Sequence, residues 1–233
     1  MTTLCIDTSS ITCACSIVKD GEVLADIFIN NGMNHSTTLL PSIKKVLAES
    51  NLPVSEIENI SVTVGPGSFT GVKISAATVK GLAFTADIPC TAVSTLEALA
   101  YNRKSDGLVC AVMDARRGML YNAIFKIENG KALRLTEDRQ ISCEDLFTEI
   151  CGKDILITGD GTELFKKFCN ERGFKPDAAE DELKYVRGIG IYKAAENMGF
   201  KETPHDKLVP EYLRLPQAER ERLEKERGIK NEQ

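Results

Sequence analysis

The sequence predicts an α/β fold made of two similar lobes, each with a mixed sheet flanked by helices. Three short runs rich in Ile, Val and Cys predict a β-meander at residues 3–6, 13–18 and 23–30. An Asp-Gly pair at positions 20 and 21 is typical of the tight turn of a hairpin. A second set of such runs follows at residues 108–113, 120–127 and 132–135. Helices and strands alternate after each meander, so we expect the same design twice.

The remaining elements follow from apolar spacing of three and four residues and from runs that are apolar throughout. In the first lobe they are helix 34–51, strand 60–64, helix 72–86, strand 91–93 and helix 94–101. In the second lobe they are helix 143–150, strand 154–157, helix 162–172 and helix 185–198. Alternating Glu, Lys and Arg predict one more, solvated helix at 217–227. The predicted lobes are residues 1–102 and 103–215, followed by a charged helical tail at 216–233.

Charge and composition restrict the classes of function. The formal net charge of −5 argues against binding of nucleic acid without a basic partner, because phosphate recognition depends on Lys and Arg. No secretion signal and no run of about 18 apolar residues is found, so we expect a cytoplasmic protein without membrane contact. The eight cysteines are then expected to stay reduced and to lie mainly in the core, and no metal site is predicted.

A glycine-rich loop, GPGSFTG at residues 65–71, joins a predicted buried strand to a predicted helix. Free N–H groups and the helix dipole make this a suitable place for an anion. The loop matches neither the Walker nor the dinucleotide fingerprint, so a tight turn that permits close packing is an equal alternative. Two hairpin turns carry further candidates, for which ordinary turn roles are also open. The possible phosphate ligands are Asp7, Thr8, Ser9, Gly65, Gly67, Ser68, Thr70, Gly71, Arg116 and Arg117.

His35 stands at the start of the first long predicted helix. A metal site on one helix face needs a second His three or four residues later, and Thr38 and Leu39 occupy those positions. We therefore expect a capping or interface role for His35 rather than metal ligation.

Several motifs occur in order from the N-terminus to about residue 215. They are DTS at 7–9, NHS at 34–36, LLP at 39–41, GPGSFTGVKI at 65–74, KGLA at 80–83, VSTLEALA at 93–100, DARR at 114–117 and PEYLR at 210–214. Together they resemble the signatures of the TsaB family, also called YeaZ. The long glycine-containing block is the most specific of them.

The resemblance implies an actin-like ATPase fold of the Hsp70, actin and sugar-kinase type, duplicated as the two lobes. It also implies a role in making N6-threonylcarbamoyladenosine beside the anticodon of tRNAs that read codons starting with A. In this family the chemistry belongs to a partner, TsaD, whose corresponding helix has a His-x-x-x-His metal dyad where this chain has His35 and Leu39. A non-catalytic subunit is therefore expected. It would bind TsaD through its first lobe, work with the ATPase TsaE, contact tRNA only indirectly and form a homodimer without TsaD.

The partner surface is expected on the helices at 34–51 and 72–86, because their apolar residues exceed what one small lobe needs for its core. The predicted interface residues are His35, Leu39, Leu40, Ile43, Leu47, Val72, Ile74 and Val79. An alternative is an ATP-dependent kinase or ATPase of the same fold, which uses Asp7 and the glycine-rich turns around the phosphates. For the non-catalytic subunit no cofactor is predicted, although weak binding of ATP or ADP is left open. Such sequences are often labelled M22 glycoprotease-like, which suggests a metalloprotease. This sequence contains no pattern of metal-ligating residues that would support that activity.

Overall fold

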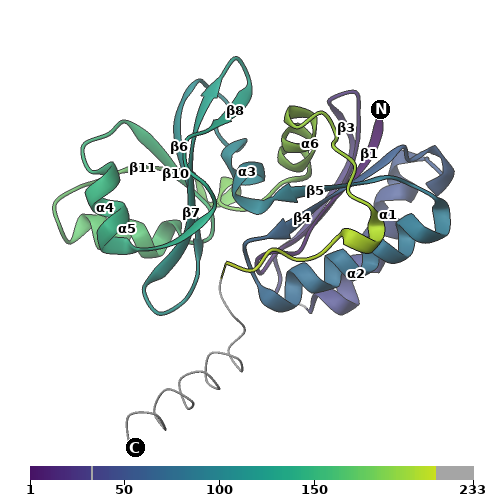
Figure 1. Cartoon of the computed structure of the whole chain (residues 1–233), viewed down its shortest axis with the longest axis horizontal. Coiled ribbons are helices and arrows are strands. Elements are labelled where there is room, and N and C mark those ends of the chain that lie inside the picture. The colour runs from purple at the N-terminus through teal and green to yellow at the C-terminus, as the bar shows by residue number, and fades with distance from the viewer. Residues whose placement is uncertain (33, 214–233) are drawn as a thin grey trace, which may run out of the picture.

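A computed structural model describes residues 1–32 and 34–213, and it shows two lobes side by side, each built on one sheet (Figure 1). The first sheet has the strand order β3-β2-β1-β4-β5. Its strands are β1 (Thr2–Asp7), β2 (Cys13–Lys19), β3 (Glu22–Ile29), β4 (Asn59–Gly65) and β5 (Cys90–Ser94). The first three are antiparallel, and β4 and β5 run parallel to β1.

The second sheet repeats this plan with the order β11-β10-β6-β7-β8. Its strands are β6 (Gly107–Asp114), β7 (Met119–Glu128), β8 (Lys131–Arg134), β10 (Ile155–Thr158) and β11 (Asp177–Ala178), with β9 (Arg139–Ser142) paired to β7. Again a three-stranded antiparallel unit is followed by strands parallel to its first member. The chain thus has the duplicated actin-like fold that the sequence predicts.

Six α-helices of the described residues cover these sheets in three layers (Figure 1). Helices α1 (His35–Ser50) and α2 (Phe69–Ala86) pack on the outer face of the first sheet, and α4 (Cys143–Ile150) and α5 (Thr162–Asn170) pack on that of the second. Helices α3 (Thr95–Ala100) and α6 (Gly188–Asn197) lie between the sheets. Short 3-10 helices occur at Val54–Glu56, Asp181–Leu183 and His205–Lys207.

Side-chain caps determine where several helices begin. Asn34 accepts a hydrogen bond from Ser36 N and caps α1, while Ser94 accepts one from Glu97 N and caps α3. Helix α2 begins at Phe69, three residues before the predicted start, because Ser68 accepts a hydrogen bond from Gly71 N. The glycine-rich loop therefore supplies the first turn of the helix as well as the connection to it.

The sequence predictions missed β9 and β11 and placed the start of α6 three residues too early. The two strands are only four and two residues long, which is too short for an apolar period to show. Gly188 and Gly190 do not break α6. A Cβ on Gly188 would overlap the Ser16 side chain, and one on Gly190 would lie 2.5 Å from the carbonyl oxygen of Ala98. These glycines allow α6 to lie directly on its neighbours.

The end of the described chain returns to the first sheet. The backbone N–H of Thr203 donates to the carbonyl oxygen of Cys90, at 2.7 Å, and Leu208 is fully buried in the first-sheet core. The backbone N–H of Glu211 donates to the carbonyl oxygen of Val64, also at 2.7 Å. We expected residues 103–215 to form the second lobe, but α6 and residues 201–213 pack against the first sheet. The helix predicted at 217–227 lies outside the described residues.

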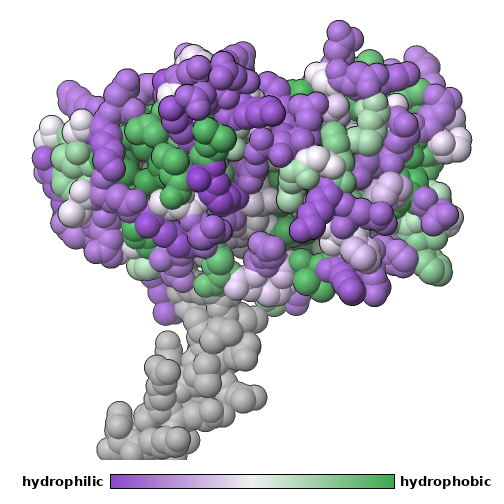
Figure 2. Space-filling model, turned by 45° about the horizontal axis from the view of Figure 1, so that its top comes forward, coloured by the Kyte–Doolittle hydropathy of each residue, from purple (hydrophilic) through white to green (hydrophobic). Residues whose placement is uncertain are grey.

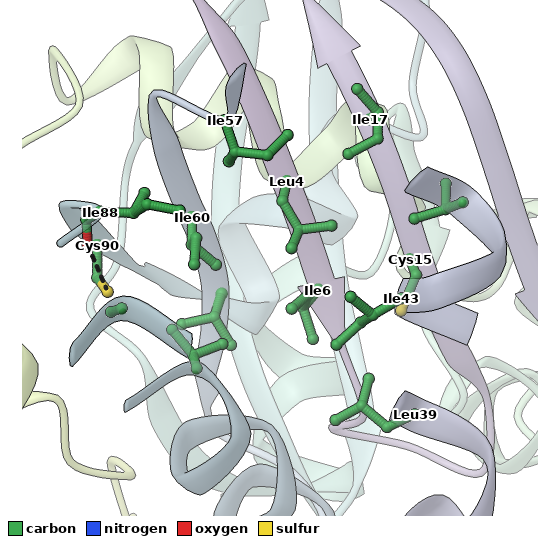
Figure 3. Packing of buried hydrophobic residues seen from close by; sticks show 14 of the residues in the cluster. Leu4, Ile6, Cys15, Ile17, Leu39, Ile43, Ile57, Ile60, Ile88 and Cys90 are labelled. Atoms are coloured by element: carbon green, nitrogen blue, oxygen red, sulfur yellow. Dashed lines mark hydrogen bonds between the residues drawn. The ribbon is translucent and has the colours of Figure 1, made fainter. Parts of the chain in front are cut away.

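Three hydrophobic clusters support this arrangement, one on the outer face of each sheet and one between the sheets. Figure 3 shows the first, in which Leu4 and Ile6 of β1 face Leu39 and Ile43 of α1. Seven cysteines are buried and unpaired, and the eighth, Cys151, is exposed. None of the helices in the described part of the chain is long and apolar enough to cross a bilayer.

Candidate functional site

The turn between β1 and β2 lies at the carboxyl end of β1, on the side of the sheet where β4 also ends. Asp7 closes β1 and is completely buried. Its Oδ1 accepts hydrogen bonds from Ser9 N at 3.1 Å and from Thr63 Oγ1 at 2.5 Å, whereas its Oδ2 has no hydrogen-bond partner among the described residues. Burial raises the pKa of Asp7, and the hydrogen bonds from Ser9 and Thr63 oppose that rise only in part.

The glycine-rich loop packs directly on this turn. Ser68 N donates to the carbonyl oxygen of Ser9 at 2.7 Å, and Thr8 Oγ1 donates to that of Gly71 at 2.8 Å. A Cβ on Gly67 would overlap the Ser9 carbonyl, and one on Gly71 would overlap the Thr8 carbonyl. The glycines are thus required for close contact between backbones, whether or not an anion also binds here.

Gly65 serves the same purpose toward the returning chain. Its φ of +125° lies in a region that other residues rarely adopt, and a Cβ there would lie 2.5 Å from the carbonyl oxygen of Glu211. The N–H groups of Ser68 and Gly71 are both engaged within the protein, by Ser9 and by the Ser68 hydroxyl. These two amides, one at the N-cap and one in the first turn of α2, are among the possible anion donors, and here they have protein acceptors.

His35 connects the start of α1 to the same turn. Its Nε2 lies 2.8 Å from the carbonyl oxygen of Ser10, and since a carbonyl only accepts, Nε2 carries the proton in this contact. Leu39, four residues later, is buried in the core beneath α1 (Figure 3). Among the described residues no group of three or more His, Cys, Asp or Glu side chains is placed to hold a metal ion.

The turn between β6 and β7, at the equivalent place in the second lobe, is an exposed turn. Arg116, Arg117 and Gly118 all have positive φ values, of 67°, 57° and 72°. Asp114 Oδ1 accepts from Arg116 N at 2.7 Å, and its Oδ2 pairs with the Arg116 guanidinium at 3.2 Å. The Arg116 side chain is 79% exposed, so this ion pair stabilises the turn only weakly.

Asp160 is a candidate site residue that the sequence analysis did not select. It follows β10, and its Oδ1 accepts from Asp114 N at 3.1 Å. Burial raises the pKa of Asp160 to about 6; the hydrogen bond from Asp114 N opposes this, and the charges of Asp114 and Asp7 add to it. The charge of Asp7, in the first lobe, is thus one of the causes that raise the pKa of Asp160 in the second lobe. The feature of the sequence that could have pointed to Asp160 is the Gly-Asp-Gly run directly after a predicted strand.

Comparisons with known proteins decide the family. A family model described as TsaD, tRNA N6-adenosine threonylcarbamoyltransferase, matches residues 22–221. The chain is 34% identical to the tRNA threonylcarbamoyladenosine biosynthesis protein TsaB of Bacillus subtilis, over 97% of this chain and all of that protein. The chain belongs to the TsaB family. The TsaB protein of Buchnera aphidicola subsp. Schizaphis graminum is 29% identical, over 84% of this chain and 90% of that protein.

A solved structure agrees with this membership. YeaZ from Pseudomonas aeruginosa superposes with a TM-score of 0.79 at 26% identity and covers 91% of this chain and 99% of that one. The likeness extends over both lobes, so the family resemblance that the motifs indicate is confirmed along almost the whole chain.

The predicted TsaB-type interface residues fall into two groups. Four of them are buried in the core of the chain itself, namely Leu39, Ile43, Val72 and Val79. The structure therefore corrects the expectation that these side chains are exposed and available to bind a partner. They are covered because α1 and α2 both turn their apolar stripes toward the first sheet (Figure 3).

The remaining candidates lie closer to the surface. Leu40 is 50% exposed, whereas His35, Leu47 and Ile74 are half-buried, the last two against the core. Phe84 of α2, which the sequence analysis did not select, is 73% exposed. Apolar exposure is not confined to these helices, since Figure 2 shows a hydrophobic area over the second lobe as well. Exposure alone therefore does not identify an interface.

Proposed function

We propose that this chain is a non-catalytic subunit in the biosynthesis of N6-threonylcarbamoyladenosine in tRNA, supporting a TsaD-type catalytic partner together with a TsaE-type ATPase. Relatives that match nearly the whole chain carry the name of this pathway. The observation that carries the non-catalytic role is on α1. His35 is held by the Ser10 carbonyl, and the position four residues later is a core leucine rather than a second metal ligand.

The glycine-rich loop supports the same proposal. In an actin-like ATPase the backbone at such loops approaches the nucleotide phosphates, and that requires free N–H donors. In this chain two of these donors, Ser68 N and Gly71 N, already have protein acceptors, which reduces the number of N–H groups that could meet a phosphate. With a net charge of −5, the chain is also poorly suited to bind tRNA by itself, so we assign the tRNA contact mainly to the partner and place the complex in the cytoplasm.

Reconstitution of tRNA threonylcarbamoylation with purified TsaD-type and TsaE-type proteins tests the proposal. Omission of this chain is expected to abolish product formation, and adding it back is expected to restore it. Undiminished modification without the chain would contradict a required subunit.

The outer face of α1 and α2 is our candidate partner surface, and a homodimer through the same face is proposed for the chain alone. Leu40→Asp places a charge on this face and leaves the core intact, because Leu40 is exposed. Ile43→Asp would place a charge in the core, because Ile43 is buried. We expect Leu40→Asp to lose most binding to the TsaD-type partner in a co-purification assay. Leu133→Asp, at a leucine of β8 that is 45% exposed on the second lobe, is the matched control and is expected to bind normally. Equal binding by both variants would remove α1 from the interface.

A second candidate, a nucleotide-binding kinase or ATPase, is favoured by one observation. Asp7 and Asp160 bring carboxylates from both lobes near the turns where actin-like enzymes hold a nucleotide and its metal ion. Titration calorimetry of the isolated chain with ATP and magnesium separates the candidates. We expect weak or no binding and no turnover; micromolar affinity together with hydrolysis would favour the enzyme.

A further inference from the structure

The two sheets share one hydrophobic core, which is formed around α3 and α6. Fully buried residues of the first sheet, such as Cys5, Val18 and Val93, belong to the same cluster as Val109 and Phe125 of the second. Both helices are filled with buried side chains: Leu96 and Leu99 in α3, and Ile191, Ala194 and Ala195 in α6, are at most 1% exposed. Separation of the lobes would expose this cluster to water, at a free-energy cost in proportion to the apolar area.

Arg134 adds a polar contact at the edge of this core. This residue ends β8 in the second lobe, and its guanidinium pairs with Glu97 of α3 at 3.0 Å and with Asp138. Asp138 in turn accepts a hydrogen bond from Ser94 Oγ, at the end of β5, at 2.5 Å. The side chains of Arg134, Glu97 and Asp138 are 24%, 16% and 13% exposed, so these pairs are much less screened by solvent than surface ion pairs.

A second polar contact lies on another strand of the second sheet. Asn102 follows α3, and its side-chain amide donates to Thr158 Oγ1 of β10 at 3.2 Å and to the carbonyl oxygen of Leu183 at 2.7 Å. Asn102 and Thr158 are both buried. The second lobe is thus tied to α3 at both ends of that helix, by Arg134 at one and by Asn102 at the other.

We propose that the two lobes of this chain are locked into one rigid body, with Arg134 as the main polar clasp, so that they do not open and close relative to each other. The inference goes beyond the role of partner subunit, since it concerns the motion of the isolated chain. Actin-like ATPases move their lobes around a nucleotide in a hinge motion. A chain whose lobes share a dry core and buried clasps would instead present a fixed surface.

A distance measurement between the lobes tests this proposal. Cys151, the exposed cysteine, lies in the second lobe, and a Lys44→Cys substitution adds a second exposed thiol on α1. With spin labels at both sites, and with the labelled chain diluted in an excess of unlabelled chain so that distances between the two chains of the proposed homodimer do not contribute, double electron–electron resonance is expected to give one narrow distance distribution that magnesium-ATP at millimolar concentration leaves unchanged. Two populations, or a shift of the distribution on adding magnesium-ATP, would overturn the proposal.

The clasp is tested in the same labelled background. Arg134→Met keeps the volume of the side-chain stem but removes the ion pairs, so we expect a broader distance distribution and faster amide exchange in α3 and β8. Arg139→Met is the matched control, because Arg139 is similarly buried but pairs with Asn122 and Glu149 inside the second lobe. It is expected to leave the width unchanged.

Two results would contradict the role of Arg134 as a clasp. One is an unchanged width of the distance distribution in folded Arg134→Met, and the other is equal broadening of that distribution in Arg134→Met and Arg139→Met. If Arg134→Met does not fold, Glu97→Gln gives the same test, because it removes the carboxylate of α3 that pairs with Arg134 and retains an acceptor for Asn197. An unchanged width of the distance distribution in folded Glu97→Gln would equally contradict the clasp.

Discussion

The equivalent hairpin turns of the two lobes are built very differently. The first, after β1, is buried, and the glycine-rich loop packs onto its backbone at Thr8 and Ser9. The second, after β6, is an exposed turn in which Arg116 and Arg117 have positive φ values. The strand order is the same in both lobes, so duplication of the topology did not duplicate the environment of the turn.

The difference follows from what comes next in the chain. In the first lobe β4 leads into α2 through a loop whose glycines let it approach the turn. Glu211 of the returning chain packs on the start of this loop, at Val64 and Gly65. In the second lobe the loop after β10 contacts the β6 strand through Gly159 and Asp160 and leaves the arginine turn uncovered. A phosphate approaching the first turn therefore meets a packed backbone, whereas one approaching the second meets solvated guanidinium groups.

The largest expected effect is at the contact that buries the first turn. In Gly71→Ala the new Cβ overlaps the carbonyl oxygen of Thr8, so the free energy of unfolding should fall by roughly 3 kcal/mol or more, or folding should fail. Gly81→Ala is the control on the same helix, where no atom lies within 4 Å of the added Cβ, and it should stabilise by up to about 1 kcal/mol. Urea unfolding measures both. Equal effects would mean that the packing of the loop on the turn is unimportant.

The next effect concerns the carboxyl group inside the first turn. Thr63→Val removes the hydroxyl that donates to Asp7 and leaves a buried carboxyl with one hydrogen bond fewer. We expect a loss of about 1.5–3 kcal/mol in the free energy of unfolding, because the lost bond is to an ionisable, buried group. Thr85→Val, at an exposed threonine of α2, is the control and should change stability far less. A loss below that of the control would show that the contact is unimportant for stability.

Asp160 makes the free energy of unfolding of the chain depend on pH. Its folded pKa, about 6, lies above the ordinary value of 3.8, so protonation favours the folded state and this stability is lost as the pH rises through 6. Asp160→Asn imitates the protonated form and should raise the free energy of unfolding by about 1–3 kcal/mol at pH 8, with the gain vanishing near pH 4. Asp154→Asn, at an exposed position, should show no such trend. A gain that is independent of pH would contradict the titration of Asp160.

The smallest effect is expected at the exposed second turn. Arg116→Ala removes an ion pair that is largely solvated and should change the free energy of unfolding by less than about 0.5 kcal/mol. Chemical denaturation at low and high salt measures this. A loss above about 1 kcal/mol that disappears in salt would show a stronger electrostatic role than exposed pairs usually have. The two turns would then be less different than their burial indicates.

The strands and helices were largely predictable because each carries its own apolar period or run. The contacts of the candidate site were not. Asp7 and the glycine-rich loop were selected separately, and only the parallel pairing of β1 with β4 brings them together. Asp160 resembled an ordinary turn residue, since its burial depends on the neighbouring β6 and Asp114. The apolar stripe of α1 was visible in the sequence, but the surface that covers Leu39 and Ile43 was not.

By itself the sequence determined the family, the two meanders and the missing second ligand on α1, because these depend on residues that are neighbours along the chain. The tertiary structure decided which apolar residues are core, how α6 and residues 201–213 return to the first sheet, and why the glycines are required. Those outcomes depend on contacts between segments far apart in the chain, such as Thr3 with Asn59 of β4 and Val64 with Glu211, which are 147 residues apart, and no local pattern records them.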